Sequence, residues 1–582
     1  MGRGIRLLPT MIVLLAVGAA AETAKPRVPQ EELSISTGEV GRYGGRLVVS
    51  ERAEPKTLNP VIAVDRPSRD ILFRMHADLG HINRATQRTE AALAKTWAVS
   101  KDGRQYTFHL RRGIRFSDGH PFDAEDVVFS FQVYLDEKVH SWQRDLLIAH
   151  GQTITVRKID QYTIEVQLAQ PDAAAERMFD SVSMLPKHLL ENAYRGGTLA
   201  QTWGLTTPPD QIAGLGPFRL KSYVPGQQIT LEKNPYYWKA DAKGNRLPYL
   251  NEITFLVVPS EDAEAIRFQA GDTDIISRLS SENYALLAKE QQTRGYILQD
   301  LGPGLEYNFL LLNMNDDTAG RLPEIARKLP WFREPNFRRA VSAAIDRAAI
   351  VRLVYQGRAT PLWTHVTPGN NLWLNSHIPQ PAASQSKARE LLQAAGSRWD
   401  RGGKLLDRNG QAVEFSILAS SSNSQRVQIA NIIQQDLAKL GMQVSVVPLE
   451  FRAYVQRITQ SHEYEAAVMG LQSGDADPNP EMSIWMSSGI THLWNLGEKQ
   501  PATPWETEID RLMQQQMVTL NYQARKKLYD RVQEIVGEQL PIICVASSNI
   551  LVGSKKGLGN FRPAILDHYT LHNVEEIFWN RN

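Results

Sequence analysis

Few residue patterns in this chain could support covalent chemistry. Ser384 and Lys387 form a Ser-x-x-Lys pattern, which supplies a serine nucleophile in penicillin-binding proteins. The same serine stands where a helix is predicted to begin, and serine is a favoured N-cap residue, so we interpret the pattern as a helix cap. His462-Glu463 lacks the second histidine of the His-Glu-x-x-His zinc motif. The one cysteine, Cys544, lies in an apolar run and is interpreted as a small buried side chain.

Other catalytic and cofactor motifs are missing from the sequence. It contains neither a Gly-x-Ser-x-Gly nucleophile elbow nor a Gly-x-x-x-x-Gly-Lys-Ser/Thr phosphate loop. One cysteine and scattered histidines do not form a metal-ligand pattern. We therefore predict a protein that has no catalytic residue, no metal and no cofactor, and that acts by binding.

The first 21 residues predict export. Arg3 and Arg6 precede an apolar run, Leu7 to Val17, which is too short to span a bilayer, and Ala19-Ala20-Ala21 offers a cleavage site. This is the pattern of a secretory signal peptide. No cysteine stands at the cleavage site to carry a lipid. We expect a periplasmic protein of a two-membrane bacterium that is not lipidated.

The rest of the chain is electrically balanced. Removal of residues 1–21 takes two arginines from the 65 basic residues and leaves 63, against 63 acidic residues. This balance gives no reason to expect nucleic acid or anionic lipid as a partner. About 560 residues exceed what one hydrophobic core usually serves, so we expect several lobes in a monomeric chain.

The elements that organise the chain begin at residue 94. Apolar residues alternate with polar ones on both sides of the turn Lys101-Asp102-Gly103, which predicts a β-hairpin. Asp123, with Asp126 three residues later, is placed to cap the helix that follows. Between residues 413 and 470 strands alternate with helices, which predicts parallel strands in a doubly wound lobe.

Longer helices are predicted in the second half of the chain. We expect one helix from Asn336 to Tyr355 and another from Ser386 to Ala395, each followed by glycine. A last helix is expected from Thr503 to about Gln539, with possible breaks.

Several stretches carry ordered motifs. Residues 97–127 contain Trp-x-Val-Ser-x-Asp-Gly, then Tyr-Thr-Phe-x-Leu-Arg, then Phe-Ser-Asp-Gly-x-Pro-x-x-Ala-x-Asp-Val. Residues 214–238 add Gly-x-Gly-Pro-Phe, Pro-Gly-Gln and Asn-Pro-x-Tyr-Trp, and residues 344–347 read Ala-Ile-Asp-Arg. In this order the motifs resemble those of the large extracytoplasmic solute-binding proteins that serve oligopeptide and dipeptide ABC importers.

The resemblance implies an α/β fold with two lobes, the type II-like periplasmic-binding-protein fold of the large cluster with an extra subdomain. Lobe one would be discontinuous, and a hinge with crossings near Leu305 and Pro541 would join it to a doubly wound lobe two. The expected segments are the signal peptide 1–21, lobe one 22–65, an inserted subdomain 66–205, lobe one 206–306, lobe two 307–540 and lobe one 541–582.

The resemblance also implies a ligand site between the lobes. In the family a Gly-Trp-x-x-Asp-x-x-Asp-Pro segment supplies a carboxylate for the α-ammonium group of a peptide. Its counterpart here, residues 470–478, has Leu471 at the aromatic position and Gly474 at the first aspartate. Asp475 and Asp477 are the candidate carboxylates, although Asp475 would otherwise be a solvated loop acid and Asp477-Pro478 an ordinary turn.

Other candidate ligand contacts are aromatic and polar residues in glycine-bearing loops or on the expected crossing strand. Flat rings suit a cleft that accepts varied side chains, although tryptophans more often lie in a core. The strand candidates could hydrogen-bond an extended peptide through their backbone. The candidates are Trp485, His492, Trp494, Asn495, Trp363, Tyr307 and Asn308.

Taken together, the resemblance implies that the chain captures oligopeptides or dipeptides and delivers them to an ABC permease, with the ATPase on a separate chain. Other cargo stays open, namely cello-oligosaccharides, nickel chelates, haem or opines. A secreted hydrolase of cell-wall peptides or antibiotics, or a periplasmic chaperone or sensory subunit, are alternatives of another class.

Overall fold

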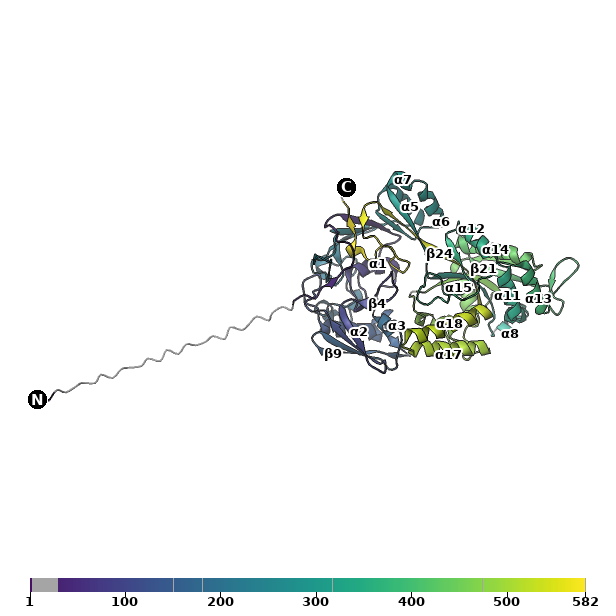
Figure 1. Cartoon of the computed structure of the whole chain (residues 1–582), viewed down its shortest axis with the longest axis horizontal. Coiled ribbons are helices and arrows are strands. Elements are labelled where there is room, and N and C mark those ends of the chain that lie inside the picture. The colour runs from purple at the N-terminus through teal and green to yellow at the C-terminus, as the bar shows by residue number, and fades with distance from the viewer. Residues whose placement is uncertain (3–29, 150, 181, 317, 474, 581–582) are drawn as a thin grey trace.

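The computed structural model of the chain describes residues 1–2, 30–149, 151–180, 182–316, 318–473 and 475–580. Nearly all of the predicted signal peptide, residues 3–21, and also Gly474, lie outside the described residues. Figure 1 shows two lobes side by side, the first built mainly from the N-terminal part of the chain and the second mainly from its second half.

Lobe one contains two four-stranded sheets. In the first, with the order β11-β12-β14-β2, β2 pairs in parallel with β14 and the other pairs are antiparallel. The second has the order β5-β6-β10-β9 and is antiparallel throughout. The strands are β2 (Arg46–Glu51), β5 (Ala94–Val99), β6 (Gln105–Leu110), β9 (Thr155–Asp160), β10 (Thr163–Gln167), β11 (Phe218–Val224), β12 (Gln228–Lys233) and β14 (Glu252–Val257).

The predicted hairpin and helix form as expected. β5 and β6 pair in antiparallel register, and α2 (Ala124–Leu135) follows them. The Asp123 carboxylate accepts the backbone N–H of Glu125, while the Asp126 carboxylate accepts the backbone N–H of Asp123 at 3.1 Å. This reciprocal capping box fixes the start of the helix.

Segments from the first and last parts of the chain pack together in lobe one. Leu571, Val574, Ile577 and Phe578 belong to the same buried cluster as Leu47 of β2. Lobe one is therefore discontinuous in sequence, as predicted.

Lobe two is built on the strands β17, β23, β21 and β22 of a mixed sheet, which continues through β24 (Ile542–Lys555) to β15 (Ile275–Ser277). β21 pairs in parallel with both β22 and β23, which confirms the doubly wound pattern, whereas β17 lies antiparallel between β23 and β24. The elements are β17 (Glu306–Leu312), β21 (Glu414–Ser420), α14 (Ser424–Ala438), β22 (Gln443–Leu449), α15 (Phe451–Gln456) and β23 (Ala466–Gln472).

One predicted helix of lobe two is divided into two, and the last helix has a break of the kind that the sequence predicts. The stretch predicted as one helix from Asn336 to Tyr355 forms α11 (Pro335–Ala344) and α12 (Arg347–Val354). Ile345 is extended, and the Asp346 carboxylate accepts the backbone N–H of Ala349 and caps the second helix. The last helix is also divided, into α17 (Pro504–Val518) and α18 (Tyr522–Gln539), with Asn521 as the new cap. In both places an internal capping side chain ends the continuous helix.

A single long strand, β24 (Ile542–Lys555), runs from one lobe to the other. Its first residues pair with β17 in lobe two, and its last residues pair with β16 (Tyr296–Pro303) and β15 (Ile275–Ser277) beside α5 (Glu261–Ala270). Residues 542–546 lie in the lobe-two core. The crossing therefore lies near residues 547–550, several residues after Pro541, and beside the β16–β17 junction at Leu305.

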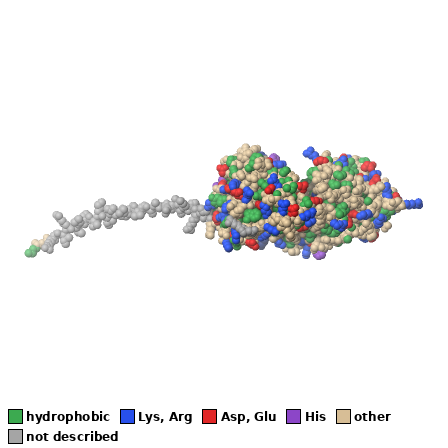
Figure 2. Space-filling view, turned by 90° about the horizontal axis from the view of Figure 1, so that it is seen from above, with side chains coloured by type: hydrophobic (Ala, Val, Ile, Leu, Met, Phe, Trp, Pro, Cys, Tyr) green, Lys and Arg blue, Asp and Glu red, His purple; other side chains and the backbone are tan. Residues whose placement is uncertain are grey.

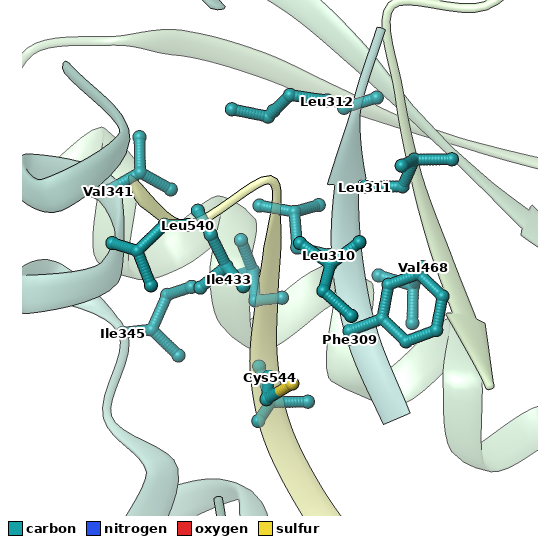
Figure 3. Packing of buried hydrophobic residues seen from close by; sticks show 14 of the residues in the cluster. Phe309, Leu310, Leu311, Leu312, Val341, Ile345, Ile433, Val468, Leu540 and Cys544 are labelled. Carbon is teal, nitrogen blue, oxygen red and sulfur yellow. The ribbon is translucent and has the colours of Figure 1, made fainter. Parts of the chain in front are cut away.

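The lobe-two core surrounds β17, whose side chains are buried from Tyr307 to Leu312. Figure 3 shows residues of β17, α11, α14 and β23 meeting around Cys544. Burial raises the pKa of the Cys544 thiol to about 12, so this cysteine is a packed, unreactive side chain. Within the described residues, no helix has the length and apolarity needed to span a membrane.

Candidate functional site

A cavity of about 870 Å³ lies between the two lobes. The space-filling view shows a notch between the two halves of the molecule (Figure 2). Lobe one contributes residues of α1 (Arg66–Met75), of the segment 172–183 and of the segment 566–568, together with His76 and Arg278, which we call the lobe-one wall. Lobe two contributes the lobe-two wall, namely Gln472, Asp475, Asp477, Asn479, Pro480, Met482 and Met517.

Helix α1 positions much of the lobe-one wall. The Asp65 carboxylate accepts the backbone N–H of Ser68 and caps the helix, and a proline in the first turn suits its start. Four lining residues, Arg66, Arg69, Asp70 and Phe73, recur at spacings of three and four, so one face of the helix is turned to the cavity. The charged groups of this wall therefore stand on a rigid element.

The carboxylate of Asp70 is held by its neighbours. It lies 2.7 Å from Nδ1 of His568 and 3.1 Å from the Arg66 guanidinium. Burial alone would raise the pKa of Asp70, but the hydrogen bond from His568 and the charges of Arg74 and Arg66 outweigh it and hold that pKa well below its ordinary value. Asp70 is therefore ionised at neutral pH and already neutralised within lobe one.

The two candidate carboxylates of the lobe-two wall have different partners. Asp477 receives two hydrogen bonds from Arg525 of α18, at 2.6 and 2.7 Å, so its charge is neutralised inside lobe two. Asp475 instead pairs with Arg177 of lobe one, with Nε 2.5 Å from Oδ2 and a second contact between Nη2 and Oδ1. The pair is only partly exposed to solvent. Asp475 thus depends on the opposite lobe for its counter-charge.

Further contacts join the walls beside this ion pair. The backbone N–H of Ala173 donates to the carbonyl of Met517 at 2.7 Å, and Asn479 donates to Asp172 at 3.0 Å. The lobes therefore meet along one edge of the cavity through the segment 172–177.

Two arginines of the lobe-one wall face aromatic rings. The guanidinium of Arg69 lies 5.8 Å from the ring centre of Trp142, and that of Arg278 lies 5.6 Å from the ring centre of Tyr569. Neither makes an ion pair with a carboxylate among the described residues. Stacked guanidiniums of this kind suit the recognition of a carboxylate or another planar anion.

His76 is a further polar group of the lobe-one wall. It is buried, stacks on Trp203 with ring centres 5.9 Å apart, and neither ring nitrogen has a hydrogen-bond partner within the described residues. Burial lowers the pKa of His76 to about 3, so the ring is neutral at physiological pH.

Four of the predicted contacts lie in the interior of lobe two and do not line the cavity. Trp485 donates to Glu481, and Trp494 donates to Glu506. His492 is fully buried, and Asn495 bonds to Asp316. Trp485 is the last residue of α16 (Met482–Trp485) and not in a loop as predicted, whereas the other three lie in the loop between α16 and α17, and all four are buried.

The remaining predicted contacts also stand apart from the cavity lining. Tyr307 and Asn308 are buried on β17, where both backbone edges already pair with β23 and β24, so this strand has no free edge for a peptide. Trp363 donates to the carbonyl of Pro381 and lies over Arg347. Of the nine predicted contacts, the structure brings Asp475 and Asp477 to the cavity.

Comparison with known proteins decides the family. The model of the bacterial extracellular solute-binding proteins, family 5, matches residues 88–492. The chain belongs to this family. It is 26% identical to a probable ABC transporter-binding protein of Deinococcus radiodurans over 93% of both chains. It is 29% identical to heme-binding protein A of Haemophilus influenzae over 79% of both.

A third relative is similar in sequence and also has a solved structure. The oligopeptide-binding protein AppA of Bacillus subtilis is 24% identical over 86% of both chains. Its solved structure, a complex with a nonapeptide, has a TM-score of 0.67 and covers 93% of this chain and 100% of its own. The family 5 resemblance and its two-lobed fold are thereby confirmed.

Family 5 membership gives the cavity a general role. Proteins of this family are extracytoplasmic and hold a solute for an ABC transporter permease. The arginines and aromatic residues of the lobe-one wall were not among the predicted contacts. Their one sequence signal is the helical spacing of Arg66, Arg69, Asp70 and Phe73 after the cap at Asp65.

Proposed function

We propose that this chain is a periplasmic peptide-binding protein, exported by a signal peptide and not lipidated, which captures oligopeptides or dipeptides between its lobes. As a monomer it delivers them to the permease of an ABC importer whose ATPase is a separate chain. The observation that carries the proposal is the Arg177–Asp475 ion pair, which joins the two lobes at the edge of the cavity.

The two charges of the ion pair can each bind the opposite charge at one end of a peptide. When the lobes separate, Asp475 loses its counter-charge and lobe two offers a carboxylate, while lobe one offers Arg177 with Arg69 and Arg278 nearby. A peptide ammonium group would pair with Asp475, and its carboxylate with a guanidinium. Asp477 stays neutralised by Arg525 whether the lobes are open or closed, so it is a positioning residue in this proposal.

The mechanism is a shift between open and closed populations. A peptide that touches both walls contacts them together only when the lobes are closed, so its differential affinity for that form favours closure. The cavity volume falls within the range of about 300–1,000 Å³ that is usual for ligand sites. Relatives that carry peptide in their names, AppA among them, support the same cargo.

The hydrolase alternative has little geometric support. Ser384 Oγ accepts the backbone N–H of Lys387 at 3.2 Å as the N-cap of α13 (Gln385–Ala394). The Lys387 ammonium group bonds to Glu390 at 2.7 Å on the exposed side of that helix. A lysine in this position does not activate the serine.

The proposal is tested by calorimetric titration with one peptide in four forms: free, N-acetylated, C-amidated and blocked at both ends. Free peptide should bind at least tenfold more tightly than the N-acetylated form, and C-amidation should also weaken binding. Equal affinity for the free and doubly blocked forms would contradict the proposal, since the end charges would then contribute nothing.

A further inference from the structure

A group of three buried side chains in lobe two lies apart from the cavity. We call it the lobe-two triad: His492 and Glu498 on the loop 486–503, and Glu506 in the first turn of α17. His492 Nε2 lies 3.3 Å from a Glu498 carboxylate oxygen and 3.7 Å from a Glu506 oxygen. The side chains are 0%, 5% and 4% exposed, respectively. None of the three lines the cavity between the lobes.

The hydrogen bonds of the triad leave acceptors facing one another. His492 Nδ1 lies 3.1 Å from the carbonyl oxygen of Ile484, which accepts but never donates, so Nδ1 carries the hydrogen. In the neutral ring Nε2 is then an acceptor, and it faces two carboxylates. By strict geometry Nε2 and both oxygens of Glu498 lack a hydrogen-bond partner within the described residues, while the backbone N–H of Ala502 interacts with the Glu498 carboxyl. Such an arrangement is satisfied either by a proton on Nε2 or on a carboxyl oxygen, or by a bound cation at its centre.

Glu506 is held in place by hydrogen bonds from residues outside the triad. Glu506 accepts the indole N–H of Trp494 at 3.0 Å and the hydroxyl of Thr503 at 2.7 Å, which leaves further lone pairs toward His492. Hydrogen bonds that orient a histidine and a carboxylate from behind are the usual outer contacts of a metal site.

A second group of similar residue types differs from the triad because it has a basic partner. Asp78, His81 and Asp180 also lie close together, but Arg84 donates to both oxygens of Asp180, at 3.2 and 3.0 Å. In that group a guanidinium already supplies the positive charge. In the part of the chain that the structure describes, no lysine or arginine forms an ion pair with Glu498 or Glu506.

The triad distances suit a metal ion. Zinc binds imidazole nitrogen and carboxylate oxygen at about 2.0–2.2 Å, so two ligand atoms of a tetrahedral site lie about 3.4 Å apart. The separations of 3.3 and 3.7 Å from Nε2 match that edge. One imidazole and two carboxylates suit a first-row divalent ion such as Zn²⁺.

We propose that His492, Glu498 and Glu506 bind one divalent first-row metal ion, which fastens the loop 486–503 to the start of α17. The site is structural and separate from the cargo cavity, so it does not depend on the proposed function. The exposed neighbours Gly497 and Lys499 give the ion a short path from solvent, and a water would complete its coordination.

The test uses the full mature chain without a histidine tag, stripped with EDTA and then titrated with Zn²⁺. We expect one zinc per chain to remain after gel filtration, measured by inductively coupled plasma mass spectrometry, and a melting temperature that rises with zinc concentration. Glu498→Gln should weaken zinc binding at least tenfold. Glu508→Gln, a partly exposed glutamate two residues after Glu506, is the matched control and should bind zinc like the wild type.

Two results would overturn the proposal. The first is a wild-type melting temperature that is unaffected by both zinc and EDTA, which would mean that protons alone neutralise the triad. The second is unchanged zinc stoichiometry and affinity in Glu498→Gln, which would place the zinc elsewhere. If Glu498→Gln fails to fold, the wild-type melting temperatures with zinc and with EDTA still test whether a metal ion binds.

Discussion

The two walls of the cavity neutralise their charges differently. On the lobe-one wall Asp70 and Asp180 have basic partners in the same lobe, Arg66 and Arg84. On the lobe-two wall Asp477 has Arg525 beside it, but Asp475 takes its counter-charge from Arg177 across the cavity. Charges paired within a lobe stabilise that lobe, whereas a charge paired across the lobes becomes available to a ligand when they separate.

The largest loss of stability is expected from removing the partner of Asp477. Arg525→Met leaves a buried carboxylate without its counter-charge, so we expect the free energy of unfolding to fall by about 3–5 kcal/mol. Urea denaturation measures the loss. The double variant with Asp477→Asn should lose less than Arg525→Met alone, and a loss below about 1 kcal/mol in the single variant would contradict the assigned role of this pair.

Replacing the neighbouring carboxylate should act on cargo instead. Asp475→Asn is expected to weaken the binding of a free peptide by about 1–3 kcal/mol, because a buried ammonium group loses its anionic partner. The variant should also bind free and N-acetylated peptide with similar affinity. Calorimetric titration measures both effects, and an unaltered dissociation constant would remove Asp475 as the anchor.

A pH series tests the burial of His76 in the lobe-one wall. His76 has a folded-state pKa of about 3, below its ordinary value of 6.5, so the unfolded chain binds the proton more readily. Its contribution to stability is complete above pH 6.5 and is lost as the pH falls toward 3, which amounts to about 2 kcal/mol at pH 5. His76→Phe should flatten the dependence of unfolding free energy on pH by that amount.

The matched variant is His365→Phe, since burial also lowers the pKa of His365 to about 3. It should flatten the same curve, but His365 does not line the cavity, so peptide affinity should change in the His76 variant alone. Equal changes in affinity for both variants would contradict the assignment of His76 to the wall.

The smallest effect is expected away from both walls. Ser384→Ala removes the N-cap of α13 and should cost about 1 kcal/mol of stability, measured by thermal unfolding. Peptide affinity should be unchanged. Loss of a peptidase activity in this variant would instead support the hydrolase alternative.

The sequence predicts the fold better than the site. Alternating apolar residues specify the β5–β6 hairpin, and the alternation of strands with helices specifies the parallel strands β21 to β23, because each pattern is local. The break between α11 and α12 is less visible, since Asp346 inside a helical pattern reads equally as a surface residue or as a cap. Whether Asp346 caps a helix is therefore decided by tertiary packing and not by the local sequence.

The cavity depends on residues that are far apart in the chain. Asp475 meets Arg177 across 298 positions, and Asp70 meets His568 across 498. Spacing within one segment does not reveal such pairs. Residue type also did not distinguish ligand contacts from core residues, because a tryptophan near a glycine-bearing loop suits both. Trp485 and Trp494 are buried core residues here.

In the proposed function the two lobes enclose intact peptide cargo. Native mass spectrometry of the protein purified from cells, followed by release of bound molecules in denaturant, tests it most directly. We expect a set of added masses that correspond to short unmodified peptides. Release of haem, a sugar or a nickel complex in place of peptides would contradict the account.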